Sequence, residues 1–233
     1  MNVPHHAMTD LTNALSHVDS ARAAAVSDNE KALLQVALSA FARQGYGATS
    51  ARKVALDAGL TAPMVNYYFG SKKQLFRHIG ELIFGSLVAE VLASVGGEDD
   101  LKDQVRSFVD AHVRFGAQNP IAIEFVCMVL YGPIEGHRIL DAYALQRPLV
   151  EYSRVFVEKA VADSVLQPPA DVDVDYMLGR IHDVIRNVWL AEVRLRRRRR
   201  VSGTRPEVAA EPGRRDTELD IRFLLRDMGH RDV

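Results

Sequence analysis

The chain has 233 residues and a formal net charge of −1, with 48% hydrophobic and 25% charged residues. These values are typical of a folded globular protein, and the length allows a small domain joined to a larger one. No apolar run approaches the ~18 residues that a membrane-spanning helix needs, and segment 2–20 has no signal-peptide core, so we expect a cytoplasmic protein without a membrane partner. The single cysteine, Cys127, excludes an intrachain disulfide and is interpreted as a buried, inert thiol.

The beginning of the chain predicts an arm followed by a capped helix. Residues 1–26 are small and polar, and we interpret them as a mobile N-terminal arm. Ser27 and Glu30 have the spacing of a capping box, and Gly45 ends the apolar pattern that follows. We therefore expect a first helix with one buried face. Its apolar positions, at helical intervals, are Leu34, Ala37, Leu38 and Phe41.

Two short amphipathic segments come next, joined by a glycine. Thr49-Ser50 opens the first segment and Gly59 ends it. Thr61-Ala62-Pro63 opens the second, which ends at Asn66-Tyr67-Tyr68-Phe69. Two short helices joined by a glycine turn make a helix-turn-helix, here at about residues 50–69.

The remainder of the chain predicts further helices. Ser71, with Gln74 at the third helical position, begins a long helix whose period holds to about Val95. No stretch alternates convincingly like a strand, so the expected fold class is all-α. The later helices are expected at about 99–117, 121–131, 134–166, with a break near Pro148 left open, and 172–200, followed by a polar loop at about 201–215 and a last helix ending at Gly229.

Basic residues are concentrated in the region of the helix-turn-helix. Residues 29–77 carry seven lysines and arginines against Glu30 and Asp57. A basic module on an otherwise acidic protein suits a phosphate backbone. A second basic segment, Arg194–Arg200, ends the predicted helix 172–200. We interpret it as a solvated end that complements the helix dipole, with a second nucleic-acid contact as the alternative.

In a helix-turn-helix the N-terminal end of the second helix enters the major groove, which selects candidate DNA contacts. Asn66 suits a bidentate contact with adenine, and residues 62–64 suit thymine methyl groups. Phosphate contacts are expected from helix starts and tyrosine hydroxyls, and Lys53 or Arg52 is expected on a guanine or a phosphate. Capping and packing are the alternatives for single residues, but the joint spacing favours DNA binding. The full set is Thr49, Ser50, Arg52, Lys53, Thr61, Ala62, Pro63, Met64, Asn66, Tyr67, Tyr68 and Lys72.

Three stretches carry a family resemblance. They are Phe41-Ala42-Arg43-Gln44-Gly45-Tyr46 followed by Ala48-Thr49-Ser50, then Val54-Ala55 through Ala58-Gly59-Leu60-Thr61, and then Val65-Asn66-Tyr67-Tyr68-Phe69-Gly70-Ser71-Lys72 with Leu75-Phe76. Together they resemble the DNA-binding domain of the TetR family of bacterial transcriptional regulators over residues 27 to about 87. Two features depart from that family: Leu56-Asp57, where a polar residue often precedes the alanine pair, and a longer C-terminal region.

The resemblance implies a homodimer with two three-helix DNA-binding heads, each linked by a fourth helix to an all-α regulatory domain that dimerises through the last two long helices. We therefore expect an arm at 1–26, a DNA-binding domain at 27–87, and an effector-binding and dimerisation domain at 88–233. The expected function is that of a sequence-specific transcriptional regulator, a homodimeric repressor released from a palindromic operator on double-stranded DNA by a small-molecule effector. No cofactor or metal is expected.

The candidates for an effector pocket are polar and aromatic groups embedded in apolar helices. For each of them, a packed core position is the alternative. His182 and Arg186 lie four residues apart on one helical face, which suits an anionic effector, or pairing of Asp183 or Glu192 across a dimer. The full set is His112, Phe115, Glu124, Phe125, Met128, Tyr131, His182, Arg186 and Trp189.

Other classes of function have less support in the sequence. The eight histidines fall in no metal-binding spacing, and Gly45-Tyr46-Gly47 lacks the third glycine of a phosphate-binding loop, so an enzyme is not expected. A non-specific architectural DNA-binding protein remains an alternative, and it predicts salt-dependent binding with little sequence discrimination. A ligand-independent or activating member of the same family is a further alternative.

Overall fold

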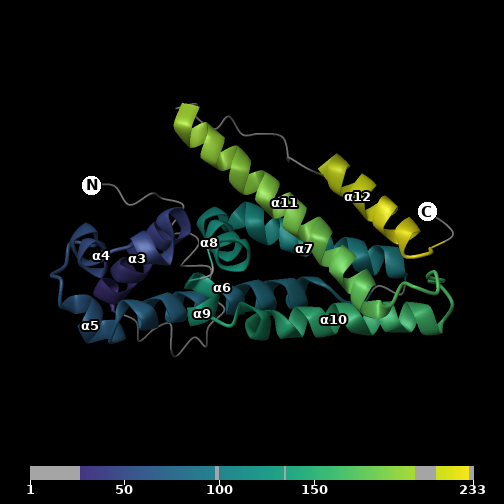
Figure 1. The fold of residues 1–233 in the computed structure, drawn as a ribbon, viewed down its shortest axis with the longest axis horizontal. Helices are drawn as coiled ribbons and strands as arrows, with labels where there is room; N and C mark the ends of the chain where they lie inside the picture. Colours follow the sequence, from purple (N-terminus) through teal and green to yellow (C-terminus); the bar gives the residue numbers. More distant parts are fainter. Residues whose placement is uncertain (1–26, 98–99, 134, 203–213, 231–233) are drawn as a thin grey trace. The chain divides into compact units, whose positions relative to one another are not determined.

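A computed structural model of the chain describes residues 27–97, 100–133, 135–202 and 214–230 (Figure 1). The predicted N-terminal arm and most of the predicted loop at 201–215 lie outside these residues. Almost all of the described residues are helical, and the extended pairing among them is an isolated bridge between Leu166 and His230. The expected all-α fold is confirmed. No single helix in the described ranges combines the length and the apolar character that a membrane span requires.

The chain divides into two units. Unit 1 comprises Met1–Glu90 and Phe115–Gln146, and unit 2 comprises Val91–Arg114 and Arg147–Val233. The predicted domain boundary near residue 87 stays a prediction. The helices are α3 (Asp28–Ala48), α4 (Ala51–Asp57), α5 (Met64–Phe69), α6 (Lys72–Ser94), α7 (Leu101–Gln118), α8 (Pro120–Tyr131), α9 (Glu135–Ile139), α10 (Ala142–Ala162), α11 (Val174–Ser202) and α12 (Arg214–Asp227).

Serine side chains begin three of the first four described helices, as the sequence predicts. The hydroxyl of Ser27 accepts a hydrogen bond from the backbone N–H of Glu30, 3.3 Å away. Ser50 caps α4 through the N–H of Lys53 at 3.3 Å, and Ser71 accepts from the N–H of Gln74 at 3.1 Å. Each cap satisfies one N–H that has no partner within the helix, so the helix starts are fixed by local chemistry.

The core of unit 1 forms where α3 packs against α4, α8 and α9. Phe41 on α3 meets Phe76 on α6 edge-to-face, with ring centroids 5.0 Å apart, and Phe76 contacts Phe125 on α8 at 5.3 Å. Every residue of α8 from Pro120 to Leu130 is buried. Apart from Glu124, which is also buried, this helix is therefore apolar around its whole circumference, as expected of a helix enclosed by protein on all sides.

Unit 2 is held together by α11, which packs along α12. The buried stripe of α11 consists of Met177, Leu178, Ile181, Ile185, Trp189 and Val193. On α12 the buried residues include Ile221, Leu224 and Leu225. An exposed ion pair between Arg180 and Asp227, with 3.2 Å between the nitrogen and oxygen atoms, also joins the two helices.

The segment predicted as one helix from 134 to 166 is two helices, and the break left open near Pro148 does not occur there. The chain breaks between α9 and α10, where the carboxylate of Asp141 accepts a hydrogen bond from the N–H of Ala144 at 3.0 Å. This side-chain cap starts a new helix in which Pro148 is accommodated. Leu140 is buried at the break, next to Gly80, where an added Cβ would lie 2.3 Å from the leucine side chain.

Candidate nucleic-acid interface

The helix-turn-helix of unit 1 is built on small buried residues and one glycine. Val54 and Ala55 of α4 and Val65 of α5 are almost completely buried, and the two helices pack together. Gly59 lies between them with φ of 75°, a left-handed conformation that side chains with a Cβ rarely adopt. The N–H of Leu60 then donates to the carbonyl of Ala55 at 2.8 Å, which closes the turn.

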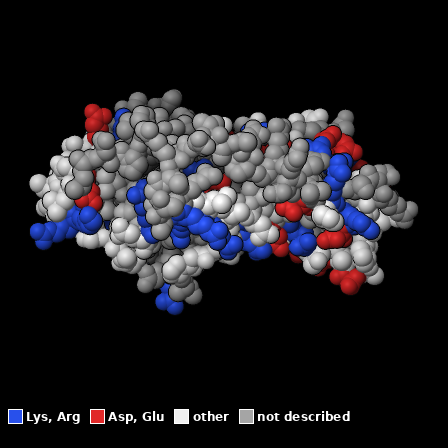
Figure 2. Space-filling model, turned by 90° about the horizontal axis from the view of Figure 1, so that it is seen from above, with Lys and Arg blue, Asp and Glu red and all other residues white. Residues whose placement is uncertain are grey.

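The turn places the start of α5 at the surface. Thr61, Ala62, Pro63 and Asn66 are exposed, and Met64 is half-buried. Basic side chains project from this left-hand end of unit 1, where α4 and α5 lie (Figures 1 and 2). A polar helix face held by a buried opposite face is the arrangement that inserts into a major groove. The structure thus brings together the residues predicted to contact bases.

The two tyrosines of α5 differ in exposure. Tyr67 is 78% exposed, whereas Tyr68 is half-buried and its ring packs edge-to-face on Tyr67 with centroids 5.0 Å apart. The Tyr68 hydroxyl accepts a long hydrogen bond of 3.5 Å from the side chain of Asn29 on α3. Tyr67 therefore has the freer hydroxyl for a phosphate, and Tyr68 also ties α5 to the start of α3.

Two predicted phosphate contacts, Thr49 and Lys72, have internal bonds. Thr49 is 3% exposed, and its hydroxyl donates to the carbonyl of Gly45 at 2.8 Å. The ammonium group of Lys72 donates to the carbonyls of Tyr46 at 2.8 Å and Thr49 at 2.9 Å, and lies 4.1 Å from the centroid of the Tyr46 ring. These bonds satisfy two backbone carbonyl groups at the C-terminal end of α3. Contact of Thr49 or Lys72 with DNA stays a prediction with less geometric support than the rest of the set.

The cations and the serine of α4 are placed at the surface. Ser50, Arg52 and Lys53 are exposed, and Lys53 forms an ion pair with Asp57 one turn later at 3.0 Å. An exposed pair of this kind contributes little to stability and is readily exchanged for a phosphate. Arg52 and Lys53 are both accessible, so the choice between them as a base or phosphate contact stays open.

The candidate effector residues fall in two groups. In unit 2, His112 and Trp189 are buried, and the indole N–H of Trp189 donates to the carbonyl of His112 at 3.0 Å. Phe108 contacts both histidines, with ring centroids 4.5 Å from His112 and 6.1 Å from His182. Phe108 was absent from the predicted set, although its spacing of four residues from His112 places both on one helical face.

Burial keeps both of these histidines neutral. Removal from water lowers the pKa of His112 to about 3, although the bond of 2.7 Å between its Nδ1 and the carbonyl of Phe108 opposes the shift. Burial also lowers the pKa of His182. Nε2 of His182 is buried and has no hydrogen-bond partner among the described residues. Together with Tyr152 and Phe156, which pack on Phe108, these residues form an aromatic and imidazole cluster, called here the His112–His182 cluster.

The other predicted pocket residues are not part of this cluster. Arg186 forms an ion pair with Asp183 at 2.8 Å, and Glu192 bonds Arg196 at 2.5 Å, so both acids postulated as partners across a dimer are paired within α11. Phe115, Glu124, Phe125 and Met128 are buried in unit 1, and Tyr131 there is 45% exposed. The predicted set is therefore divided between unit 1 and unit 2.

The fold and the helix-turn-helix together define the class of protein: an all-α chain with a helix-turn-helix in its N-terminal part. Residues 33–79 match the sequence model of the family described as bacterial regulatory proteins, tetR family. The resemblance of the chain to the TetR family is thereby confirmed. No match to a curated protein sequence was found.

Solved structures of TetR family proteins share the fold over most of the chain. A regulatory protein of the family from Rhodococcus RHA1 is 19% identical, with a TM-score of 0.66 over 88% of this chain and 100% of that one. A putative family regulator from Shewanella sp. PV-4 is 18% identical, with a TM-score of 0.64 and the same coverage of 88% and 100%. FadR from Bacillus subtilis, solved in complex with stearoyl-CoA, is 11% identical, with a TM-score of 0.65 over 84% and 97%. At these identities the likeness establishes the fold.

Proposed function

We propose that the protein is a sequence-specific transcriptional regulator, a homodimeric repressor that a small-molecule effector releases from a palindromic operator. The observation that carries this proposal is the exposed start of α5, with Thr61 and Asn66 at the surface and Val65 buried behind them. Rigid support by α4 and by the capped start of α6 gives these side chains the fixed positions that base recognition requires.

The proposed operator has the symmetry of the protein. A two-fold dimer carries two copies of α5, so it binds two half-sites in inverted orientation, with centres one helical turn of DNA, about 34–36 Å, or a longer spacing apart. Asn66 is assigned to base recognition, and Ser50, Tyr67 and Tyr68 to phosphates. Binding of this kind over a promoter excludes other proteins from it, which accounts for repression.

We place the effector at the His112–His182 cluster of unit 2. The unpaired Nε2 of His182 supports this choice, because a buried polar atom without a partner destabilises the protein unless a ligand or water bonds it. Two neutral imidazoles and three aromatic rings favour an apolar ligand body with an uncharged hydrogen-bonding group. FadR from Bacillus subtilis holds stearoyl-CoA on the same fold, so acyl thioesters belong in the first effector screen.

Effector binding is proposed to act through α6. This helix is part of unit 1 through Glu90 and continues into unit 2 from Val91 to Ser94. An effector shifts the equilibrium only as far as it binds one conformation better than the other, so the effector must prefer the conformation whose heads do not fit the operator. In a ligand-independent member of the family this coupling between effector and operator binding is absent, and in an activating member it has the opposite sign.

The test of the proposal is selection of bound sequences from a random DNA pool with the purified protein, at several salt concentrations. We expect a palindromic consensus that binds at least about 10³-fold more tightly than unrelated duplexes. The matched control is a duplex with one half-site scrambled, which a dimer binds more weakly. Binding without enrichment of any sequence would contradict the proposal and favour an architectural protein, and measured turnover of a substrate would favour an enzyme.

A further inference from the structure

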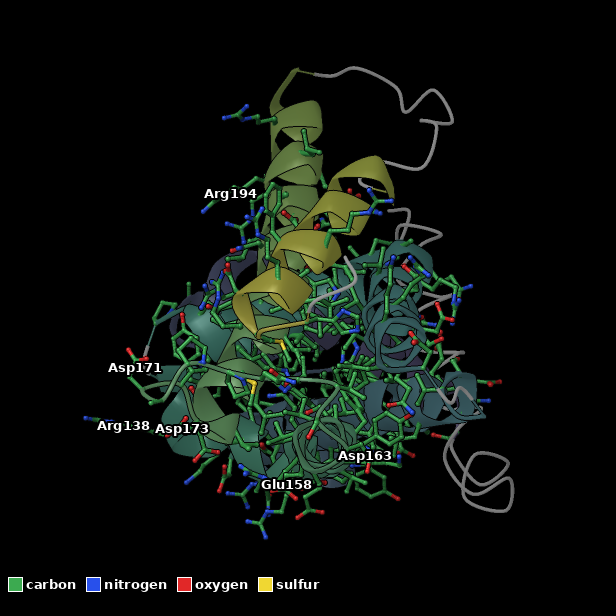
Figure 3. The ribbon with its side chains drawn as sticks, turned by 90° about the vertical axis from the view of Figure 1, so that its right-hand side faces the viewer. Arg138, Glu158, Asp163, Asp171, Asp173 and Arg194 are labelled. Atoms are coloured by element: carbon green, nitrogen blue, oxygen red, sulfur yellow. The ribbon has the colours of Figure 1, made fainter. Side chains whose placement is uncertain are left out.

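The C-terminal part of α11 presents an arginine face that the helix-turn-helix does not account for. Val193 is the last buried residue of the helix in the described part, yet α11 continues to Ser202. Arg194, Arg197 and Arg198 follow it and are all exposed. Figure 3 shows Arg194 on this part of α11, pointing away from the helix axis, while Asp171 and Asp173 lie near the N-terminal end of α11.

The three arginines share one side of the helix. At 3.6 residues per turn, positions 194, 197 and 198 fall within about one third of the circumference. Ile185 and Trp189 of the buried stripe lie on the opposite side, and Val193 lies at the edge of the arginine side, one turn before Arg197. The three guanidinium groups therefore form one continuous cationic strip, called here the arginine face.

Neighbouring cations in unit 2 are paired, in contrast to the arginine face. Arg196 points toward the buried side and bonds Glu192 at 2.5 Å, Arg186 pairs with Asp183 at 2.8 Å, and Arg180 pairs with Asp227 at 3.2 Å. No ion pair to Arg194, Arg197 or Arg198 is formed by the residues that the structure describes.

The helix dipole does not account for the arginine face. Dipole stabilisation of a cation falls off within the last turn of a helix, and the last turn of α11 is residues 199–202. Like charges spaced three and four residues apart destabilise a helix, and Arg194 has this spacing to both Arg197 and Arg198. An external polyanion removes that repulsion, so the strip is favourable in the complex and unfavourable in the free protein.

We propose that Arg194, Arg197 and Arg198 bind the phosphate backbone of duplex DNA as a second, sequence-independent contact. Guanidinium groups form bidentate hydrogen bonds with phosphate, and a row of phosphates complements the strip in charge. The inference rests on the proposed function for the choice of DNA as the polyanion. The arginine face supplies affinity, whereas α5 supplies sequence preference.

The test is the salt dependence of DNA binding by the full chain. A triple variant, Arg194→Gln, Arg197→Gln and Arg198→Gln, is compared with wild type on a 30-base-pair random duplex and on the selected operator, in a series of KCl concentrations. We expect the slope of log Kd against log salt concentration to fall by about 5 for the dimer, because it carries two arginine faces of three residues and each phosphate contact contributes about 0.9. The ratio of the two affinities stays unchanged.

Two control variants define the result. Replacement of the same three residues by lysine retains the charge and is expected to retain the slope. Arg114→Gln, Arg138→Gln and Arg147→Gln together remove equal charge from exposed positions elsewhere and are also expected to retain it. An unchanged slope in the arginine-face variant, or an equal loss in the second control, overturns the inference. So does a change in sedimentation without a change in slope, which would assign the face to a second copy of the chain.

Failure of this inference is distinguishable from failure of the proposed function. If the wild-type protein selects an operator but the glutamine variant has the same salt slope, the proposed function stands and the arginine contact is refuted. If the wild-type protein enriches no sequence but the glutamine variant has a smaller salt slope, the arginine contact stands and the proposed function is refuted. Circular dichroism of the variants verifies that α11 remains helical, since glutamine is a good helix former.

Discussion

The ammonium group of Lys72 is bonded inside unit 1, to carbonyls that precede it by 26 and 23 residues. The sequence predicts a phosphate contact at this position because a lysine at a helix start lies where anions bind. The sequence pattern around Lys72 does not identify Tyr46 and Thr49 as its partners, because only the fold brings their carbonyls to the ammonium group. Lys72 is therefore both a structural residue and a candidate for DNA contact, and stability measurements separate the two roles.

We expect Lys72→Met to lower the free energy of unfolding by about 1–3 kcal/mol, because the variant leaves the two carbonyls at the C-terminal end of α3 without their charged donor. Urea unfolding in the absence of DNA measures this effect. Lys73→Met is the matched control, since Lys73 is the exposed neighbour, and its unfolding free energy is expected to stay within about 0.5 kcal/mol of wild type. Equal stability of the two variants would remove the structural role.

Asn66 and Tyr68 differ in what their substitution is expected to change. Asn66→Ala should reduce discrimination at one base position of each half-site by about 1–3 kcal/mol, since a bidentate contact is lost.

Tyr68→Phe should weaken binding to every sequence by about the same factor, because a phosphate contact carries no sequence information. Repeating the sequence selection with each variant measures both effects. A preserved preference in Asn66→Ala would show that another residue recognises that base.

At the scale of elements, helix starts and ends are the best predicted features. Ser27, Ser50 and Ser71 cap helices as expected, and Gly59 supplies the turn, because these choices depend on side chains within three residues of the backbone that they bond. The break before α10 was missed because Pro148 is the stronger sequence signal. The helix start is fixed by the Asp141 cap, and a single Asp within an otherwise helical pattern is a weak sequence signal for a helix start.

The contact of α7 with α11 should weaken in acid. The folded state holds His112 neutral with a pKa of about 3, whereas the unfolded chain binds a proton there below about pH 6.5. Its contribution to stability is therefore complete above pH 6.5 and is lost as the pH falls, by up to about 1.4 kcal/mol per pH unit. Burial acts on His182 in the same direction, opposed in part by the charge of Asp183.

Urea unfolding at pH 7.5, 6.0 and 5.0 measures this dependence. The comparison is with His112→Asn, which does not titrate and retains a side-chain N–H for the carbonyl of Phe108. We expect the stability of wild type to fall more steeply with decreasing pH than that of the variant. Identical slopes would show that His112 gains its proton without loss of packing.

At the scale of the whole molecule, the sequence predicts an all-α chain with a DNA-binding head but not the effector site. Core and pocket residues have the same composition, so Phe125 and Met128 could not be told from Trp189 until the structure assigned them to unit 1 and unit 2. The His112–His182 cluster depends on Phe108, Tyr152 and Phe156, whose role follows from packing between distant segments.

An effector found by screening must obey reciprocity. If it weakens operator binding by a given factor, the operator-bound protein must bind the effector more weakly by that same factor, because both follow from one coupling free energy. Calorimetric titration of the effector into the free protein and into the operator complex measures the two affinities. Factors that disagree beyond error would mean that the compound acts on the DNA or at a second site, and not through the proposed coupling.

The bond between Trp189 and the carbonyl of His112 also gives the protein an intrinsic reporter. Trp189 is the one tryptophan in the sequence, and it is 3% exposed. All indole fluorescence therefore originates in unit 2, beside the proposed effector site. Its emission should shift when a compound binds the cluster or when acid loosens α7 from α11, and should stay constant when unit 1 alone unfolds. The unlabelled protein thus distinguishes events in unit 2 from events in unit 1.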